Sequence, residues 1–387
     1  MRVDEKLQEV SIVGGSVSGF LAARELASHG IDVTIYEEHR EIGIPEKCDG
    51  LVSARGMSEL GLVPPSNVVQ NTLTKCRFFS PSMKEVDIDA RKQNVIVLDR
   101  SRFDKYLAEI AAKEGAKLEL GRRVSGYSQS KEKTSLKVDS DEIASQVLLD
   151  CGGYESYIRS GGVTLQGAQY LVYGSWFEKS TVEVYVDPND APGFFKWVIP
   201  ISSDIAKIGV AGNGINTFGV MDAFVKDKGA TAFRKAAAPV IASGTIKSFV
   251  DGRIVRAGDA AGQAKPTSGG GIFTGGYGGM LAGRAASEAV KTKDVSKLKE
   301  YESAWKERFA DEFRLELYAR NVFAKLSANQ LDQLMEMIAS SDVPKKISEE
   351  GDFDRHSTAI VRAFGMTNIV SVMGLVLSNE IKNLIKI

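Results

Sequence analysis

The first forty residues contain the feature that most restricts how this chain can fold, a glycine-containing turn between a strand and a helix. Residues 10–13 form a short apolar stretch typical of a buried strand. Residues 18–29 are rich in alanine and leucine and predict a helix that ends at Gly30, and residues 32–36 predict the next strand. A strand–helix–strand unit of this kind is built around a parallel sheet. The chain therefore begins with an α/β domain of the type that binds dinucleotides.

The turn itself reads Gly14-Gly15-Ser16-Val17-Ser18-Gly19 and stands where such folds hold a pyrophosphate against helix N–H groups. Its third position, usually glycine, is serine. Glu37 ends the second strand 23 residues after Gly14 (37 minus 14), near the ~20-residue spacing at which a carboxylate receives ribose hydroxyls. Gly14, Gly15, Ser18, Gly19 and Glu37 are therefore the first candidate nucleotide ligands. A plain structural turn and a solvated acidic loop are the alternatives.

A second nucleotide-type signal lies late in the chain, where a strand runs into a glycine-rich loop. Residues 253–257 predict the strand, Gly258 and Asp259 follow it, and Gly269-Gly270-Gly271-Ile272 leads into a helix rich in alanine and glycine. The carboxylate of Asp259 suits the sugar-alcohol hydroxyls of a flavin, and the N–H groups that begin the helix suit the negative charge of a reduced flavin. The two signals together predict FAD as the cofactor. A tight turn without a ligand would use glycines in the same way.

The pattern between these two sites changes to alternating polar and apolar residues. This alternation, from residue 168 to residue 212, predicts an antiparallel sheet. Apolar residues three and four apart predict helices from 298 to 339, and residues 342–387 predict a further helical tail. We therefore expect a Rossmann-type domain, an antiparallel-sheet substrate domain and a C-terminal helical region. The expected boundaries are 1–161 and 251–297 for the FAD-binding domain, 162–250 for the substrate domain and 298–387 for the helices.

Charge and cysteine content exclude several classes of function. The 49 basic and 50 acidic residues leave a net charge of -1, so bulk charge does not collect nucleic acid. The three cysteines lack metal-type spacing, which argues against a zinc site or a disulfide framework and favours a cytosolic compartment. We expect no signal peptide at the charged start and no spanning helix in the interrupted apolar stretch 363–377. Apolar residues beside lysines at 381–386 predict either peripheral membrane contact or core packing.

Motifs along nearly the whole chain resemble the geranylgeranyl reductase family of FAD enzymes, which has the p-hydroxybenzoate hydroxylase-like fold, and its archaeal members most of all. The matching residues are Glu37, Glu41-Ile42-Gly43, Pro45-Glu46-Lys47-Cys48-Asp49-Gly50, Asp99-Arg100, Phe103-Asp104, Leu107, Phe195-Lys196-Trp197-Val198-Ile199-Pro200, Gly209, Gly212, Gly258-Asp259 and Gly269 to Ile272. The resemblance implies the same fold, FAD as cofactor and a prenylated substrate.

The resemblance also assigns roles to individual residues. It implies that FAD is contacted by Ser18, Gly19, Glu37, Arg100, Val124, Asp259, Gly271 and Ile272, with Cys48 and Asp49 in a loop beside the isoalloxazine. Gly269 and Gly270 are further candidate FAD ligands because they belong to the glycine loop. It implies that a prenyl chain lies against Phe195, Trp197, Ile199, Pro200, Gly209 and Gly212. Cys48 is the best candidate proton donor, because no histidine lies near the expected reaction centre. An inert cysteine and an ordinary sheet core are the alternatives for these two groups.

The expected activity is saturation of double bonds in geranylgeranyl chains, carried as a diphosphate or as an archaeal ether lipid. A reduced nicotinamide or ferredoxin would supply electrons, and no metal is expected. The family's Tyr-x-Trp-x-Phe-Pro motif is more apolar here, with Phe195 and Ile199 at its first and fifth places. Gly152 replaces the aspartate of related hydroxylases, which weakens a hydroxylase-type NADPH step. The alternatives are an FAD monooxygenase, a reductase of prenyl-quinone side chains and a non-catalytic prenyl-binding protein.

Overall fold

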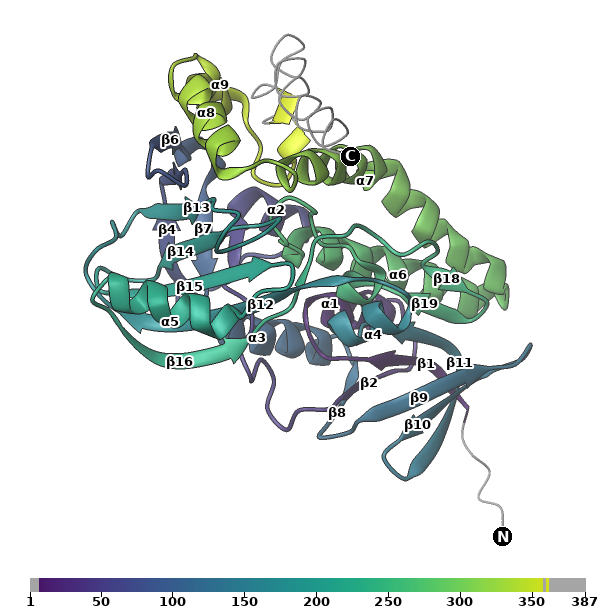
Figure 1. Cartoon of the computed structure of the whole chain (residues 1–387). Helices are drawn as coiled ribbons and strands as arrows, with labels where there is room; N and C mark the ends of the chain where they lie inside the picture. Colours follow the sequence, from purple (N-terminus) through teal and green to yellow (C-terminus); the bar gives the residue numbers. More distant parts are fainter. Residues whose placement is uncertain (1–6, 358–359, 362–387) are drawn as a thin grey trace.

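The computed structural model describes residues 7–357, 360 and 361, and it contains the expected strand–helix–strand unit at the start of the chain (Figure 1). The first sheet has the strand order β18-β19-β11-β1-β2-β8, with β10 and β9 continuing from β11 as antiparallel strands. The neighbours from β19 to β8 are parallel. The strands are β1 (Gln8–Val13), β2 (Val33–Glu37), β8 (Lys117–Leu120), β9 (Val124–Gln129), β10 (Thr134–Val138), β11 (Asp141–Asp150), β18 (Val250–Asp251) and β19 (Ile254–Arg256).

Helices α1 and α6 pack closely although they come from distant parts of the sequence. A Cβ atom at Gly279 of α6 would overlap the Ser18 carbonyl of α1, and one at Gly283 would lie 2.5 Å from the Ala22 carbonyl oxygen. The two glycines therefore let the helix backbones touch. The helices associated with this sheet are α1 (Val17–Ser28), α3 (Arg100–Lys113), α4 (Gly153–Arg159), the 3₁₀ turn η2 (Gly258–Ala261) and α6 (Ile272–Thr292).

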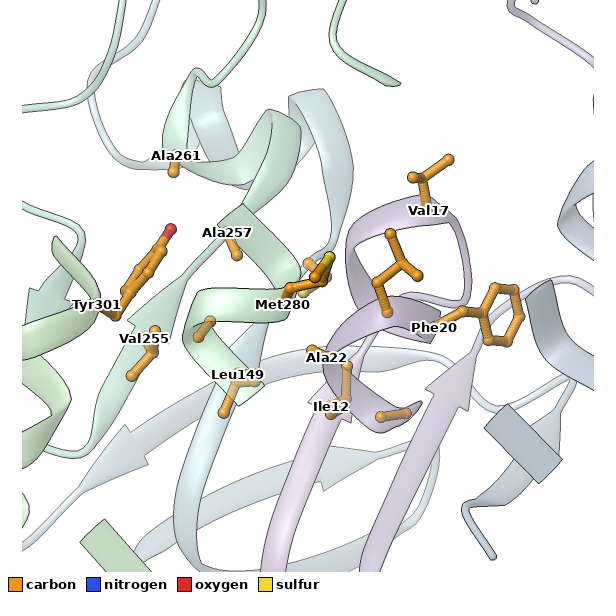
Figure 2. Packing of buried hydrophobic residues seen from close by; sticks show 14 of the residues in the cluster. Ile12, Val17, Phe20, Ala22, Leu149, Val255, Ala257, Ala261, Met280 and Tyr301 are labelled. Carbon is orange, nitrogen blue, oxygen red and sulfur yellow. The ribbon is translucent and has the colours of Figure 1, made fainter. Parts of the chain in front are cut away.

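Figure 2 shows the buried core where this sheet meets the helices. Ile12 of β1, Leu149 of β11 and Val255 of β19 are fully buried in one cluster, and burial of each such side chain contributes about 1.5–3 kcal/mol. Tyr301 joins this cluster, and its hydroxyl donates a 2.8 Å hydrogen bond to the Arg256 carbonyl oxygen. The core therefore holds the end of β19 beside β11, one strand away from β1.

The second sheet contains the expected antiparallel strands and has the order β16-β12-β15-β14-β13-β5-β6, with β17 pairing to β12. Strand β5 comes from the first hundred residues and pairs in parallel with β13, which the alternating pattern did not reveal. One face packs on helix α5 in a separate apolar cluster. The elements are β5 (Lys75–Phe79), β6 (Glu85–Asp89), β12 (Thr164–Tyr173), β13 (Thr181–Tyr185), β14 (Lys196–Pro200), β15 (Ile205–Gly212), α5 (Thr217–Asp227), β16 (Thr231–Ala237) and β17 (Val240–Ile241).

A small antiparallel sheet, β3-β7-β4, packs against the second sheet. Ile199 of β14 is buried among Leu73, Val95 and Val97 of this small sheet, so the two sheets share a core. The elements of this part are β3 (Leu51–Ser53), α2 (Ala54–Glu59), β4 (Val69–Leu73), the 3₁₀ turn η1 (Arg91–Gln93) and β7 (Val95–Leu98).

The helical stretch expected from 298 to 339 consists of two helices. The break has a local cause: the Ser327 hydroxyl accepts from the Gln330 N–H, and the Gln330 side chain accepts from the Ser327 N–H at 2.9 Å, which forms a capping box. The C-terminal elements are η3 (Val295–Lys297), α7 (Leu298–Phe323), α8 (Ala328–Ala339) and α9 (Val343–Glu350). No helix in the described residues is long and apolar enough to span a membrane. The predicted tail helix beyond 361, the apolar stretch 363–377 and the segment 381–386 lie outside the described residues.

Candidate active site

The glycine turn between β1 and α1 brings backbone into very close contact. Gly14 has a φ of +93°, and a Cβ atom there would lie 2.5 Å from the Cys151 carbonyl oxygen. A Cβ atom at Gly19 would overlap the Gly14 carbonyl. Ser18 is buried where η2 begins, since a Cβ atom at Gly258 would overlap its hydroxyl. The two predicted nucleotide signals therefore lie against each other.

Glu37 is buried at the carboxyl end of β2 and faces this turn. Its carboxylate accepts hydrogen bonds of 2.8 Å from the Gly15 N–H and 2.8 Å from the His39 N–H. Val124 begins β9 and is half-buried. It lies near Glu37 because the Arg122 N–H, two residues earlier, donates to the Glu37 carbonyl oxygen at 2.9 Å. These residues gather at the edge where a parallel sheet receives the ribose of a dinucleotide.

Arg100, at the first position of α3, lies buried between the glycine turn and the Cys48 loop. Its Nη2 donates to the Ser16 hydroxyl at 3.3 Å and to Asp104 at 2.9 Å. Burial lowers the pKa of Arg100, but the Asp104 carboxylate and the neighbouring Cys48 sulfur outweigh burial and raise it. The Nε–H of Arg100 is buried without a hydrogen-bond partner among the described residues. A bound molecule at this place can supply the acceptor that this donor lacks.

Asp259 and the triple-glycine loop form the second half of the site. The Asp259 side chain is exposed, yet surrounding protein desolvates it enough to raise the pKa of its carboxyl, a shift that Arg100 opposes. Its carboxylate accepts no hydrogen bond within the described part of the chain. Gly269, Gly270 and Gly271 are half-exposed, and the buried Ile272 begins α6. The first N–H groups of this long helix lack intrahelical acceptors and carry its positive dipole end.

Asp49 connects the Cys48 loop to the second sheet. Its carboxylate accepts a 2.7 Å hydrogen bond from the Trp197 indole N–H and a 2.8 Å bond from the Gln169 amide. Burial raises the pKa of Asp49 to about 6, against the lowering effects of Lys207 and these two donors. The loop expected beside the flavin is therefore bound directly to the predicted substrate strand.

A buried ion-pair cluster strengthens this connection. Lys207 of β15 has a side chain that is 1% exposed, and its Nζ lies 2.7 Å from a Glu46 carboxylate oxygen. Lys207 also donates to the Asp49 carbonyl oxygen at 3.1 Å, and Arg234 of β16 binds the other Glu46 oxygen at 2.8 Å. Burial would raise the pKa of Glu46, but Lys207 and Arg234 outweigh it and lower the pKa. The Cys48 loop therefore supplies a negative charge, and the second sheet supplies two positive charges.

Phe195, Trp197 and Gly209 lie together on the sheet face that carries Asp49's partners. Trp197 pairs with Gly209 across β14 and β15, and a Cβ atom at Gly209 would overlap the indole, so glycine makes room for the ring. Phe195 packs edge-on against Trp197 with ring centres 5.9 Å apart. Both aromatic residues are half-buried. They offer flat apolar surface beside the Cys48 loop.

The other three predicted substrate residues are placed differently. Ile199 shares the face of Trp197 but is 4% exposed inside the core of the small sheet. Pro200 and Gly212 are buried on the opposite face by strand alternation, and Gly212 packs against the backbone of residues 191–192. The structure therefore does not bring these three residues together with Phe195 and Trp197 at an open surface.

Several residues of this site escaped sequence reasoning. Gln169, Lys207 and Arg234 lie on three different strands, and Lys265 lies beneath the triple-glycine loop. Only Lys207 carried a local signal, since a lysine at an inward position of an otherwise apolar strand demands a buried partner. Asp150 was also missed. Its carboxylate accepts a 2.8 Å hydrogen bond from the Ser156 hydroxyl. A carboxylate therefore lies in the stretch where Gly152 stands in place of the expected aspartate.

The residues present fit FAD. Four features are suited to a pyrophosphate, a ribityl chain and a flavin edge. They are a tight backbone turn, the Arg100 Nε–H and the Asp259 carboxylate, both without a hydrogen-bond partner among the described residues, and the amino end of α6. The residues that would hold it are Gly14, Gly15, Ser18, Gly19, Glu37, Cys48, Asp49, Arg100, Val124, Asp259, Gly269, Gly270, Gly271 and Ile272. Each of these individual roles is a proposal.

Comparison with known proteins agrees with this geometry. A family model described as an FAD binding domain matches residues 8–204. Digeranylgeranylglycerophospholipid reductase of Methanocaldococcus jannaschii is 31% identical over 369 residues, covering 88% of this chain and 93% of that protein. Digeranylgeranylglycerophospholipid reductase 2 of Methanopyrus kandleri is 28% identical over 378 residues, covering 88% and 93%.

A solved structure shares the fold. A geranylgeranyl bacteriochlorophyll reductase-like protein from Thermoplasma acidophilum superposes with a TM-score of 0.83 at 24% identity, covering 95% of this chain and 98% of that one. The expected p-hydroxybenzoate hydroxylase-like architecture and FAD as cofactor are thereby confirmed. The chain belongs to the geranylgeranyl reductase family of FAD-dependent oxidoreductases.

Proposed function

We propose that this enzyme saturates carbon–carbon double bonds in the geranylgeranyl chains of an archaeal-type ether lipid. The observation that carries the proposal is the direct hydrogen bond between Asp49 of the flavin loop and the Trp197 indole of the aromatic strand. This bond places an apolar aromatic surface beside the loop that contains Cys48. The relatives named above are digeranylgeranylglycerophospholipid reductases, and their names support this substrate class. A geranylgeranyl diphosphate is the second candidate substrate.

The aromatic face can supply the binding energy that such a substrate needs. Burial of a ~20-carbon chain at about 0.8 kcal/mol per methylene contributes on the order of 10 kcal/mol before the losses of association. Phe195 and Trp197 offer ring surface, and the absence of a side chain at Gly209 keeps the Trp197 ring flat on the sheet. Phe195 replaces the family's tyrosine, so the prenyl chain does not have to displace water from a tyrosine hydroxyl when it binds.

When bound, FAD supplies the hydride chemistry of alkene saturation. The residues of this chain orient the alkene, exclude water and provide the proton for the second carbon. We assign the proton to the Cys48 thiol, whose sulfur lies beside the buried Arg100 guanidinium. Asp49 acts by holding Trp197, since both of its oxygens already accept hydrogen bonds.

A reductase of this kind also needs an electron donor, which we propose to be a reduced nicotinamide or ferredoxin. Its lipid substrate is delivered at a membrane, and residues 381–386 are the segment that we propose to touch the lipid surface from the cytoplasmic side. Both assignments rest on composition and family likeness.

The decisive experiment follows the colour of the bound flavin without oxygen. Chemically reduced holoenzyme should stay bleached until digeranylgeranylglycerophospholipid is added, and then regain its absorbance while mass spectrometry shows two hydrogens gained per flavin cycle. Geranylgeranyl diphosphate, tested in parallel, distinguishes the two candidate substrates. If neither prenyl compound reoxidises the flavin and oxygen does so with addition of an oxygen atom to a substrate, the enzyme is a monooxygenase and the proposal is wrong.

A further inference from the structure

Lys265 lies directly beneath the triple-glycine loop and is 4% exposed. A Cβ atom at Gly270 would lie 3.3 Å from Lys265 Cε and 4.0 Å from its Nζ. The ammonium donates a 2.6 Å hydrogen bond to the Phe353 carbonyl oxygen and lies 4.6 Å from the centre of the Phe353 ring. A positive charge is therefore held one backbone layer behind the loop that we propose to face the flavin.

A chain of hydrogen-bonding groups leads from Lys265 to a buried carboxylate. His356 Nε2 lies 3.2 Å from the Lys265 ammonium and 3.0 Å from the Phe353 carbonyl oxygen, and His356 Nδ1 lies 2.6 Å from the Thr267 hydroxyl. The Thr267 hydroxyl in turn donates to Glu316 at 2.7 Å. The tautomer of His356 decides which ring nitrogen donates, because Nε2 lies within hydrogen-bond distance of both the Lys265 ammonium and the Phe353 carbonyl oxygen. Glu316 is 0% exposed and comes from α7.

Other charged groups face this cluster from each neighbouring element. Glu312 lies on α7, and Asp352 and Asp354 lie in the segment after α9; all of them act on Lys265. Burial lowers the pKa of Lys265 and raises that of Glu316 to about 7. Burial and the Lys265 charge also lower the pKa of His356, so the imidazole is neutral. Glu59 of α2 raises the pKa of Asp354.

We propose that the Lys265 ammonium, opposed by the Glu316 carboxylate, sets the reduction potential of bound FAD through the triple-glycine loop. The inference rests on the proposed placement of the flavin edge against Gly269 to Ile272. The electron donor is oxidised by two electrons; FAD takes up these electrons and one proton and gains one negative charge. A fixed cation behind the loop favours that charged product, and a fixed anion disfavours it. Lys265 and Glu316 thus act as positioning residues of opposite sign.

The test is a redox titration of the purified holoenzyme against indicator dyes, without any lipid. Lys265→Met should lower the ratio of reduced to oxidised FAD at a given potential by about tenfold, which is ~30 mV for a two-electron couple. Glu316→Gln should raise this ratio by a similar factor at a pH above 7, where Glu316 is ionised. In the wild type the potential should also show an added fall as pH rises through about 7, where Glu316 ionises, and Glu316→Gln should lack it.

Helix α7, which carries Glu316, also contains a matched pair of control residues. Lys306 forms an ion pair with Glu302 and lies 5.2 Å from the centre of the Phe249 ring. This group has the same combination of lysine, glutamate and aromatic ring as the Lys265 cluster. Lys306 and Glu302 lie ten and fourteen residues before Glu316 on α7, about 15 Å and 20 Å along the axis. Lys306→Met and Glu302→Gln should leave the potential unchanged.

Opposite shifts in the two cluster variants support the proposal. Shifts of the same sign, or an unchanged potential in Glu316→Gln, overturn it even if Lys265→Met fails to retain FAD. Because the titration needs no substrate, this result is independent of whether prenyl lipids reoxidise the flavin.

Discussion

Replacement of Asp49 by asparagine should make the protein more stable near neutral pH. In the folded protein burial raises the pKa of Asp49 from 3.8 to about 6. The folded state then binds more protons than the unfolded state between these values, so wild-type stability falls as pH rises through this window. At 1.36 kcal/mol per pKa unit, the full cost at high pH is at most roughly 3 kcal/mol. About half of it, ~1.4 kcal/mol, develops between pH 5 and pH 7.5.

The local contacts allow asparagine at this position. The Trp197 indole can still donate to the side-chain oxygen of asparagine at residue 49, as it does to Asp49 at 2.7 Å. The oxygen of the Gln169 amide is buried and has no hydrogen-bond partner among the described residues. Rotation of that amide by 180° would let it accept from the new NH₂ group. The variant therefore removes a desolvated charge, and one buried polar group of Gln169 stays without a partner among the described residues, as in the wild type.

The assay is urea unfolding of FAD-saturated wild type and Asp49→Asn at pH 5 and pH 7.5, followed by tryptophan fluorescence. The difference in unfolding free energy should grow in favour of the variant at the higher pH. Asp87→Asn is the control: Arg77 lowers the pKa of Asp87, so this group is ionised in both states throughout the range and its difference should stay constant. A constant difference for Asp49→Asn would refute the argument from burial.

Three further substitutions test the site. Asp259→Ala should give folded but largely colourless protein, because we propose that its carboxylate binds the flavin's polyol chain; full flavin absorbance would remove Asp259 from the site. Cys48→Ala should keep FAD yet lower kcat for prenyl-lipid reduction about a hundredfold, the usual loss for a proton donor, and unchanged turnover would return Cys48 to a structural role. Gly209→Val should displace the Trp197 indole and raise KM for the lipid about tenfold with FAD retained, since binding energy lost at the ring is worth ~1.4 kcal/mol. Gly126→Ala, where a Cβ atom meets nothing within 4 Å, is its control and should behave as wild type.

The cofactor half of the site could be predicted because its signals are local. The turn at Gly14 to Gly19 and the loop after Asp259 each combine a strand end, tight backbone and a helix start within a few residues. Strand and helix periods follow from the spacing of apolar side chains, so the order of the main elements was also predictable. The tail beyond residue 361 was predicted in the same way and stays a prediction.

The substrate half depended on tertiary structure. Phe195, Ile199 and Pro200 form one motif in sequence, yet strand alternation and packing against the small sheet separate them in space. The bond from Asp49 to Trp197 joins residues 148 positions apart, and the pairing of β5 with β13 crosses an expected domain boundary.

The burial of Lys265 and Glu316 could not be predicted from the sequence either. From sequence alone, Lys265 is one lysine before a proline and Glu316 is one glutamate in a charged helix. Neither residue type indicates its burial, since lysine and glutamate are usually exposed unless they are paired. Their pairing depends on how α7 and the segment after α9 pack against the glycine loop. Local patterns determined the elements and the cofactor, whereas long-range packing decided which charges lie behind the triple-glycine loop, because burial of a charge depends on partners from distant segments.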